Sequence, residues 1–367
     1  MAKNSGVTLT RKQIRSIRKA VKLVLILIVV VIVLLLGASL LSQMKPSGPM
    51  ELIADEYVQL GDLPTQSEME EEQRKAELRR IEKIFEEKDT YPIDMVIDTP
   101  YCVMFDATNE ELLFAKAPNE KAYPASTTKI MTAALLMQYA KPDMTFTAGD
   151  EQDLVLEGSS LAGLKKGSQL DRDMMLDAIM IPSGNDASYC TAAEVGRLLY
   201  GNGGDELSAK EAVDIFVEKM NSTAADIGCT NTHFTCPDGF HDEQHYTTAM
   251  DLLKITIYSE KFPEIAASGS KMYRNPEFLT GESTEWYNSN RLLSEDDDYY
   301  YMYAKGLKTG MTDQAGYCVV ATAKRFDHEL IIVCLGSETQ SIRWNNTIAL
   351  FDAGFKYIRE KHAEAND

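Results

Sequence analysis

Blocks of apolar and polar residues divide the first quarter of the chain into three parts. Residues 23–41 form an apolar run without a charge, and its length is close to the roughly 20 residues that a helix needs to cross a bilayer. Residues 68–88 are rich in Glu, Arg and Lys with a narrow apolar stripe at helical spacing, which predicts a charged stalk helix. Between them, a linker over 42–65 is indicated by Pro46, Gly48, Pro49, Gly61 and Pro64. The linker and stalk together occupy 42–90.

The rest of the chain has strand-like runs at both ends of a long, mostly helical middle. Residues 101–106 and 112–115 are strand-like and are joined by a short polar stretch, so they predict a hairpin. Residues 316–323 and 330–335 predict a second hairpin, and 341–361 predicts a closing helix. This order predicts an α/β (α+β) fold with a mixed, mainly antiparallel sheet, flanking helices and a helical insert.

Charge is distributed unevenly around the apolar run. The formal net charge is −19, yet the first acidic residue is Glu51, and the run is preceded by Lys3, Arg11, Lys12, Arg15, Arg18, Lys19 and Lys22. A basic flank stays in the cytoplasm under the positive-inside rule. We therefore expect a cytoplasmic tail (1–22), a transmembrane signal anchor (23–41) and an extracytoplasmic body. The acidic body would repel phosphates, which excludes nucleic acid as a partner.

A cleaved signal peptide is the alternative reading of the amino-terminal segment. Its apolar region is usually shorter, about 7–15 residues, and ends at small residues that a peptidase can recognise. Gly37-Ala38-Ser39 offers such a site. Cleavage there would release a secreted form, so in both readings the body of the protein is exported.

Cysteine content gives little evidence of covalent cross-linking. Six cysteines in 367 residues are too few for a dense disulfide framework. Cys229 and Cys236 flank a loop and could pair, although free thiols are the favoured reading.

Ser126-Thr-Thr-Lys129 is the first candidate for catalysis. A serine hydroxyl needs a neighbouring base to become a nucleophile, and residues three apart share one face of a helix. The apolar stretch 130–137 supports a helix here. Burial and the charge of a second lysine, Lys308, are expected to keep the Lys129 amine mostly neutral. The motif alone is weak, because the same spacing occurs at 16–19, 42–45 and 268–271.

Two further motifs strengthen the case. Ser183-Gly-Asn185 opens a helical stretch after an apolar run, and Lys308-Thr-Gly310 leads into the second predicted hairpin. Each occurs once in the chain, and in this order the three motifs match the signature of active-site serine enzymes. His241-Asp-Glu-Gln-His245 is similar to a zinc-peptidase motif, but its Glu is displaced by one position and the segment is loop-like. We expect no metal and no other cofactor.

The segments around these motifs resemble those of serine D-alanyl-D-alanine carboxypeptidases, the low-molecular-weight penicillin-binding proteins. The resemblance rests on 123–133, 183–187 and 308–317 and extends from about 91 to 361. It implies a penicillin-binding protein/serine β-lactamase-like transpeptidase fold, with a catalytic domain at 91–362 and a short tail at 363–367. The implied partners are a peptidoglycan stem peptide ending in D-Ala-D-Ala and β-lactam inhibitors.

The resemblance also implies residue roles. Ser126 would be the nucleophile and Lys129 its base. Ser183 would relay a proton to the leaving D-alanine, and Asn185 would hold Lys129 and a substrate amide. The substrate would be bound by Lys308, Thr309, Gly310, Met311 and Arg343. In that set, Lys308 supplies positive potential, Thr309 and Arg343 take the terminal carboxylate, and the Met311 N–H completes an oxyanion hole with that of Ser126.

The chain departs from the family outside the three motifs. Many relatives have Asn-Pro-x-Gly where this chain has Cys236-Pro-Asp-Gly239, which affects specificity more than chemistry. Many relatives also continue into a β domain and an anchor helix, whereas this sequence ends at Asp367.

Two other functions compete with a carboxypeptidase. A serine β-lactamase would share the nucleophile, but one large class uses Ser-Asp-Asn and a separate Glu that activates water. Here the second motif is Ser-Gly-Asn, and no Glu-x-x-Leu-Asn segment follows it. A non-catalytic penicillin-binding sensor is the other rival. The complete set of motifs and a cytoplasmic tail of only 22 residues, too short to fold as a signalling domain, argue against it.

The topology can be tested on whole cells. Protease added to intact spheroplasts should degrade the part after residue 41 and spare the amino-terminal tail, because a helix of this length and flanking charge crosses the membrane once. Immunoblotting with antibodies against each part measures this. Recovery of a soluble form that begins near Ser39 would instead establish cleavage.

Overall fold

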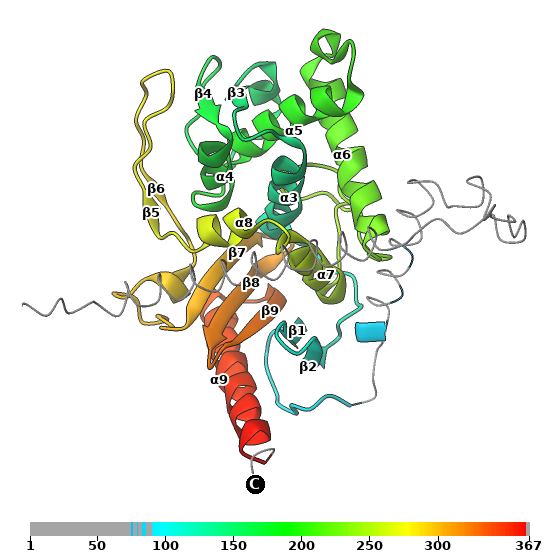
Figure 1. Cartoon of the computed structure of the whole chain (residues 1–367), viewed down its shortest axis with the longest axis vertical. Coiled ribbons are helices and arrows are strands. Elements are labelled where there is room, and N and C mark those ends of the chain that lie inside the picture. The colour runs from blue at the N-terminus through cyan, green and yellow to red at the C-terminus, as the bar shows by residue number, and fades with distance from the viewer. Residues whose placement is uncertain (1–74, 76–78, 80–82, 86–89, 365–367) are drawn as a thin grey trace, which may run out of the picture. The chain divides into compact units, whose positions relative to one another are not determined.

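Five strands from distant parts of the chain form one antiparallel sheet (Figure 1). This computed structural model describes residues 75, 79, 83–85 and 90–364. The order across the sheet is β2 (Glu111–Lys116), β1 (Tyr101–Asp106), β9 (His328–Ser337), β8 (Gly316–Arg325) and β7 (Ala304–Thr312). All four pairings are antiparallel. The first two strands therefore pair with the last ones, and the helical middle of the chain is an insertion between them.

Both faces of this sheet are covered, which explains the apolar runs within β1, β8 and β9. Side chains alternate along a strand, so Ile331 and Val333 of β9 enter one core while Ile332 and Cys334 enter the other. The covering helices are α7 (Ala249–Ser259) and α8 (Pro263–Gly269) on one side and α9 (Gln340–Glu364) on the other. Strands that are buried on both faces tend to read as near-continuous apolar runs.

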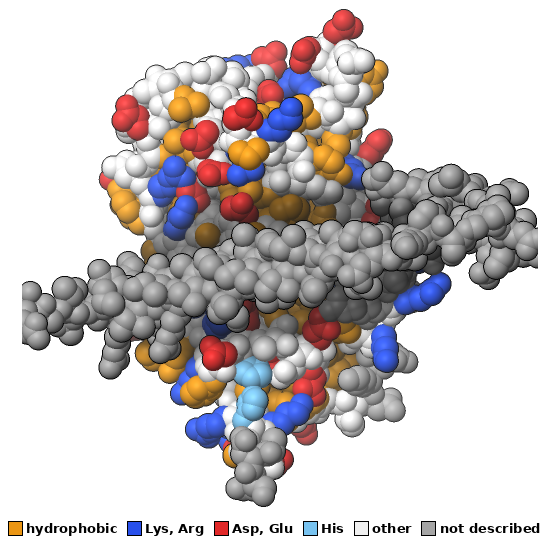
Figure 2. Space-filling model, in the orientation of Figure 1, with side chains coloured by type: hydrophobic (Ala, Val, Ile, Leu, Met, Phe, Trp, Pro, Cys, Tyr) orange, Lys and Arg blue, Asp and Glu red, His pale blue; other side chains and the backbone are white. Residues whose placement is uncertain are grey.

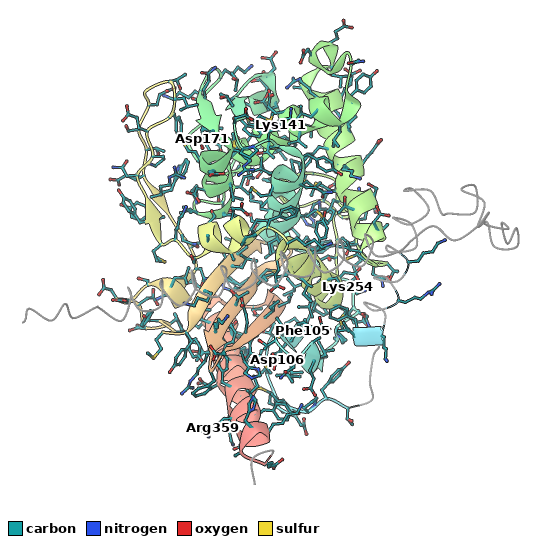
Figure 3. All side chains as sticks on the ribbon, in the orientation of Figure 1. Phe105, Asp106, Lys141, Asp171, Lys254 and Arg359 are labelled. Carbon is teal, nitrogen blue, oxygen red and sulfur yellow. The ribbon has the colours of Figure 1, made fainter. Side chains whose placement is uncertain are left out.

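The helical insert is built around α3 (Lys129–Tyr139), which is buried on all sides from Lys129 to Met137. A helix that is apolar around its circumference belongs in a protein interior. The surrounding helices are α4 (Arg172–Met180), α5 (Asn185–Tyr200) and α6 (Ala209–Asp226). Side chains fill the space between these helices (Figure 3), and Asp171, labelled there, caps α4 by accepting the Met174 N–H at 2.7 Å.

Short elements connect the helices and the sheet. Two small antiparallel pairs join β3 (Thr145–Thr147) to β4 (Gln169–Asp171) and β5 (Tyr273–Arg274) to β6 (Trp286–Tyr287). The 3₁₀ turns are η1 (Ala125–Thr128), η2 (Asp150–Leu154), η3 (Gly204–Glu206) and η4 (Arg291–Leu293). On the face shown in Figure 2, acidic and basic side chains are interspersed rather than segregated.

The structure confirms the expected fold class, both hairpins and the closing helix. The sheet was expected to be mainly antiparallel, and all pairings in the five-stranded sheet are antiparallel. The predicted tail (1–22) and span (23–41) lie outside the described residues, as do most of 42–90 and residues 365–367. Of the expected stalk, Phe85 is described, and its ring lies 5.5 Å from that of Phe105 on β1. Within the described ranges, no helix combines the length and apolarity needed to cross a membrane.

All six cysteines are free thiols. Cys229 donates through Sγ to the Asp251 carbonyl, while the Cys236 Sγ lies 3.5 Å from His245 Nδ1. The two cysteines thus have separate partners, in keeping with the favoured reading of the sequence.

A buried carboxylate connects the insert to the segment that leads to β7. Asp177 of α4 is 1% exposed and accepts hydrogen bonds from Ser268 Oγ at 2.5 Å and Lys271 Nζ at 2.6 Å. Arg274 of β5 also donates to it. Ser268 and Lys271 form one of the additional Ser-x-x-Lys matches, and the structure gives both residues to Asp177. This Ser-x-x-Lys match therefore has a structural role: Lys271 forms an ion pair with Asp177, and Ser268 forms a hydrogen bond with it.

Replacing Asp177 with Ala should destabilise the fold by about 2 kcal/mol, since breaking a buried ion pair is costly but both cations retain partial solvent contact. Urea denaturation measures the loss. Asp214→Ala is the matched control, because it removes an exposed pair with Lys210 on α6 and should change stability by about 0.5 kcal/mol at most. Equal effects of the two substitutions would contradict the structural role.

Candidate active site

Ser126 and Lys129 meet at the start of α3, as their spacing predicts. Ser126 lies in η1, Lys129 is the first residue of α3, and Lys129 Nζ lies 3.1 Å from Ser126 Oγ. Ala125, just before the serine, has a φ of 48°, a left-handed conformation that costs free energy for a residue with a side chain. The backbone is thus turned sharply at the point where it presents the candidate nucleophile.

The Lys129 amine is completely buried and has three hydrogen-bond partners. Besides Ser126 Oγ, Nζ lies 2.7 Å from Asn185 Oδ1 and 2.7 Å from the Asp238 carbonyl oxygen. These two oxygens can only accept, so they take two N–H groups. The remaining position faces Ser126, where a protonated amine would donate and a neutral amine would accept the serine O–H. The same geometry therefore serves both protonation states.

Burial lowers the pKa of Lys129 from 10.5 to about 8, against the opposing effect of the carboxylates of Asp238 and Asp186. The predicted direction is confirmed. An amine with this pKa is only about one-tenth neutral at pH 7, so the expectation of a mostly neutral lysine is wrong. The repulsion expected between the Lys129 and Lys308 amines acts on both of them, and it is resolved at Lys308. Burial and then the charge of Lys129 lower the pKa of Lys308.

The second motif lies where α5 begins, beside Lys129. Asn185 is the first residue of α5, and its Nδ2 donates to Ser159 Oγ at 2.8 Å while Oδ1 holds Lys129. Ser183 has a φ of 62°, a strained conformation. Its buried hydroxyl has no hydrogen-bond partner among the described residues. A buried polar group without a partner is costly unless a ligand completes it, which fits a hydroxyl that acts on bound substrate.

The third motif is in the middle of edge strand β7, which passes directly against Ser126. A Cβ added at Gly310 would lie 2.9 Å from the Ser126 nitrogen and 3.0 Å from the Pro124 oxygen. Only a glycine allows this approach, and it brings the backbone of Met311 next to that of Ser126. Lys308 is 2% exposed and its Nζ donates to the Thr309 carbonyl at 3.2 Å. The third motif thus brings the backbone of β7 and a buried lysine to the neighbourhood of the serine.

Thr309 is on β7, and Arg343 contacts the neighbouring strand β8. Arg343, on α9, is 3% exposed, donates to the Cys318 carbonyl at 3.2 Å and stacks against Trp344. Its Nε has no partner within the described part of the chain, and burial lowers its pKa to about 10. Arg343 is therefore not an ordinary surface arginine. The Thr309 Oγ1 lies 2.5 Å from Ser289 Oγ.

Sequence reasoning missed several residues that shape this site. Ser289 contacts Thr309, and Ser159 contacts Asn185. Asp186 fixes the adjoining loop by accepting the N–H groups of Ala162, Gly163 and Leu164 at 2.8–2.9 Å. Ser159 and Ser289 stand in loops, where a polar residue carries no spacing signal. Asp186 directly follows the second motif in α5, but its contacts join it to a loop 22–24 residues earlier in the chain. These contacts therefore emerge only in three dimensions.

His245, from the segment similar to a zinc-peptidase motif, binds Thr128, which directly precedes Lys129 in the chain. Its Nδ1 accepts the Thr235 N–H at 3.0 Å, so Nε2 carries the proton and donates to Thr128 Oγ1 at 2.8 Å. Burial lowers the pKa of His245 to about 4, and the ring is therefore neutral at pH 7. Both ring nitrogens are occupied by protein partners.

Comparison with known proteins identifies the family. The model of the family described as D-alanyl-D-alanine carboxypeptidase, peptidase S11, matches residues 88–339. This chain belongs to that family. All three motifs fall within the matched range, as does the whole sheet, and the sequence resemblance is thereby confirmed.

Several relatives of the S11 family are similar over the same region. The D-alanyl-D-alanine carboxypeptidase DacF of Bacillus subtilis is 31% identical over 69% of this chain and 61% of its own length. That of Streptomyces sp. K15 is 30% identical over 66% of this chain and 82% of its own length. The chain spans about three fifths of DacF and of the Escherichia coli enzyme DacC.

Solved structures of similar proteins share the fold. The crystal structure of the Streptomyces K15 DD-transpeptidase has a TM-score of 0.65 and 28% identity, and covers 72% of this chain and 99% of its own. The D-alanyl-D-alanine carboxypeptidase DacD of Francisella tularensis has a TM-score of 0.61 and 25% identity over 73% of each chain. The expected penicillin-binding protein fold is thus confirmed.

The base can be tested by substitution and by pH. Lys129→Arg should reduce acylation of Ser126 by a fluorescent β-lactam by at least about 100-fold, because a guanidinium stays protonated and cannot accept the serine proton. For the unchanged protein the acylation rate should rise with pH through a midpoint near 8 and level off above about 9, where most of the Lys129 amine is neutral. Circular dichroism checks that the variant is folded. Normal labelling of a folded Lys129→Arg protein would assign the base to another group.

Proposed function

We propose that this protein is a serine-type D-alanyl-D-alanine carboxypeptidase that removes the terminal D-alanine from peptidoglycan stem pentapeptides. One observation carries the proposal: the buried Lys129 amine lies 3.1 Å from the Ser126 hydroxyl, and β7 passes against that serine. A serine with an adjacent buried amine and preorganised backbone donors is suited to acyl transfer. Membership of the S11 family agrees with this chemistry.

The first half of the reaction forms an acyl-enzyme. Thr309 and Arg343 bind the terminal carboxylate, and Lys308 adds positive potential. The last peptide carbonyl then lies against Ser126 and the N–H groups of Ser126 and Met311. Lys129 takes the serine proton as Oγ attacks the carbonyl carbon, and the two backbone N–H groups stabilise the oxyanion.

Collapse of this intermediate breaks the peptide bond. The leaving nitrogen of D-alanine receives a proton through Ser183, whose hydroxyl lacks a protein partner. Asn185 holds Lys129 on one side and a substrate amide on the other. Water then enters the space left by D-alanine and attacks the acyl-serine. The products are free Ser126 and a peptide shortened by one residue.

A β-lactam should stop the same cycle at its midpoint. It offers a carboxylate and a strained amide, so Ser126 attacks it as it attacks the peptide. The amine that leaves remains covalently attached to the acyl group and obstructs the position that water needs. A serine β-lactamase overcomes this with a dedicated base, for which the sequence offers no Glu-x-x-Leu-Asn segment.

The acyl acceptor, water or an amine, can be identified in the same assay. The Streptomyces K15 structure is named a transpeptidase, whereas the curated relatives are named carboxypeptidases. A transpeptidase passes the acyl group to an amine and a carboxypeptidase passes it to water. We propose water as the acceptor here.

We also propose that the enzyme works outside the cytoplasmic membrane, held by a single helix at 23–41. The charge pattern and the apolar run support this, and a stem peptide is an extracytoplasmic substrate. The catalytic domain would span 91–362, with 42–90 as linker and stalk and 1–22 as the cytoplasmic tail. A cleaved signal peptide that yields a secreted enzyme is the alternative.

The reaction can be tested on the full-length, detergent-solubilised protein with a pentapeptide ending in D-Ala-D-Ala. We expect release of D-alanine alone, and Ser126→Ala should abolish it because the acyl-enzyme cannot form. Intact-mass spectrometry after penicillin treatment should find one adduct on the wild type and none on Ser126→Ala. Adding an amine acceptor separates hydrolysis from transfer. Rapid penicillin turnover without D-alanine release would favour a β-lactamase instead.

A further inference from the structure

The loop 236–240 carries a buried carboxylate, that of Asp238, next to Lys129. The loop is fixed against η1 and the first turn of α3: Thr132 Oγ1 donates to the Pro237 carbonyl at 2.5 Å. A Cβ added at Gly239 would lie only 1.9 Å from the Ala125 oxygen, so the chain is in close contact there. Between these two contacts stands Asp238, which is 1% exposed. Its position relative to Lys129 is therefore rigid.

Asp238 approaches Lys129 in two ways. Its carbonyl accepts the amine at 2.7 Å, and its carboxylate lies within about 5 Å of that carbonyl by covalent geometry alone. The carboxylate Oδ1 accepts the Phe240 N–H at 3.2 Å. In the described part of the chain no ion pair includes Asp238. Its carboxylate is thus not in direct contact with a cation, and it is buried beside the carbonyl that holds the Lys129 amine, where electrostatic effects are weakly screened.

The other titratable groups around Asp238 are neutral at pH 7. Burial, followed by the charge of Asp238, raises the pKa values of Tyr189 and Cys236. Burial lowers the pKa of His245 to about 4 although Asp238 opposes this. Asp238 contributes to the pKa shift of each of these three groups, and none of them carries a charge at pH 7 that could compensate its effect on Lys129.

The remaining charges near Lys129 come from two other elements. Asp186 on α5 also favours the protonated amine, but its effect is smaller than that of Asp238, and its carboxylate is bound by backbone N–H groups. Lys308 on β7 is the nearby cation, and the burial of both lysines works against charging either of them. Asp238 is thus the main group that supports the protonated form.

We propose that the Asp238 side chain sets the proton affinity of Lys129 and so fixes the pH range in which Ser126 becomes acylated. This inference rests on the proposed role of Lys129 as the base. The Asp238 carboxylate acts on the reaction through Lys129, whose amine its own backbone carbonyl holds, so Asp238 is a positioning residue. The carboxylate keeps the amine basic enough to take the serine proton, at the cost of a smaller neutral fraction near pH 7.

Asp238→Asn isolates the charge, because the backbone carbonyl that holds Lys129 is unchanged and the side chain keeps its shape. The test measures acylation rate against pH with a fluorescent penicillin on the full-length protein. The midpoint should fall by about one pH unit, as expected when a nearby opposite charge is removed. The rate at pH 6.5 should rise several-fold, since more of the amine is neutral, while the plateau at high pH should fall.

Asp242→Asn is the matched control. Asp242 lies in the same region of the chain but is exposed, and its Oδ1 accepts the Gln244 N–H at 2.7 Å, a bond that Asn preserves. Asp242→Asn removes one carboxylate, as Asp238→Asn does, but the midpoint of its acylation rate against pH should stay at the wild-type value. Asp238→Glu, which keeps the negative charge, should also leave the midpoint close to that value.

A folded Asp238→Asn protein with the wild-type midpoint would overturn the proposal. If that variant does not fold, Asp238→Ser provides a second neutral side chain with the same expected shift, and failure of both to fold would make Asp238 structural and also overturn it. Failure of the proposed function is distinguishable, because the wild type itself would then show no acylation at any pH. A pH-dependent wild type with an unmoved variant contradicts the role of Asp238 alone.

Discussion

Burial of one amine is the constraint on which the whole site depends. A lysine nitrogen without water must find its hydrogen-bond partners within the protein, and Lys129 finds them on η1, α5 and the loop after α6. Three segments separated by up to 109 residues must therefore meet at one nitrogen atom. The same burial makes the amine acidic enough to exchange a proton near neutral pH. Assembly of the fold and activation of the base are consequently one requirement.

The backbone around the nucleophile is strained or crowded where side chains would interfere. Ala125 and Ser183 adopt positive φ values, and β7 can approach Ser126 only because Gly310 has no side chain. Such conformations persist when the surrounding packing determines them. Here the packing comes from α3, which is buried all round, and from the sheet. A rigid interior thus holds the reacting groups in place before substrate arrives.

The sequence allowed much of this to be anticipated. The three motifs, both terminal hairpins and the closing helix all have local signals, either a fixed spacing or a regular apolar period. Asp238 and Ser289 have no such signal, because their contacts with Lys129 and Thr309 join loops to distant elements. The size of the pKa shift of Lys129 was also misjudged. This shift depends on the balance between burial of the amine and the effect of a nearby carboxylate, and only the fold reveals where that carboxylate lies.

Strand order also has a consequence for how the chain reaches this structure. β1 lies between β2 and β9, and its Cys102 faces Cys334, which is 232 residues later in the chain. During synthesis from the amino terminus, the β1–β2 hairpin forms early with one edge unpaired. Such an edge can pair with other strands until its own partner arrives, and contacts this far apart in sequence form slowly. The β9-facing edge of β1 can therefore be paired as in the native sheet only when almost the entire chain has been made.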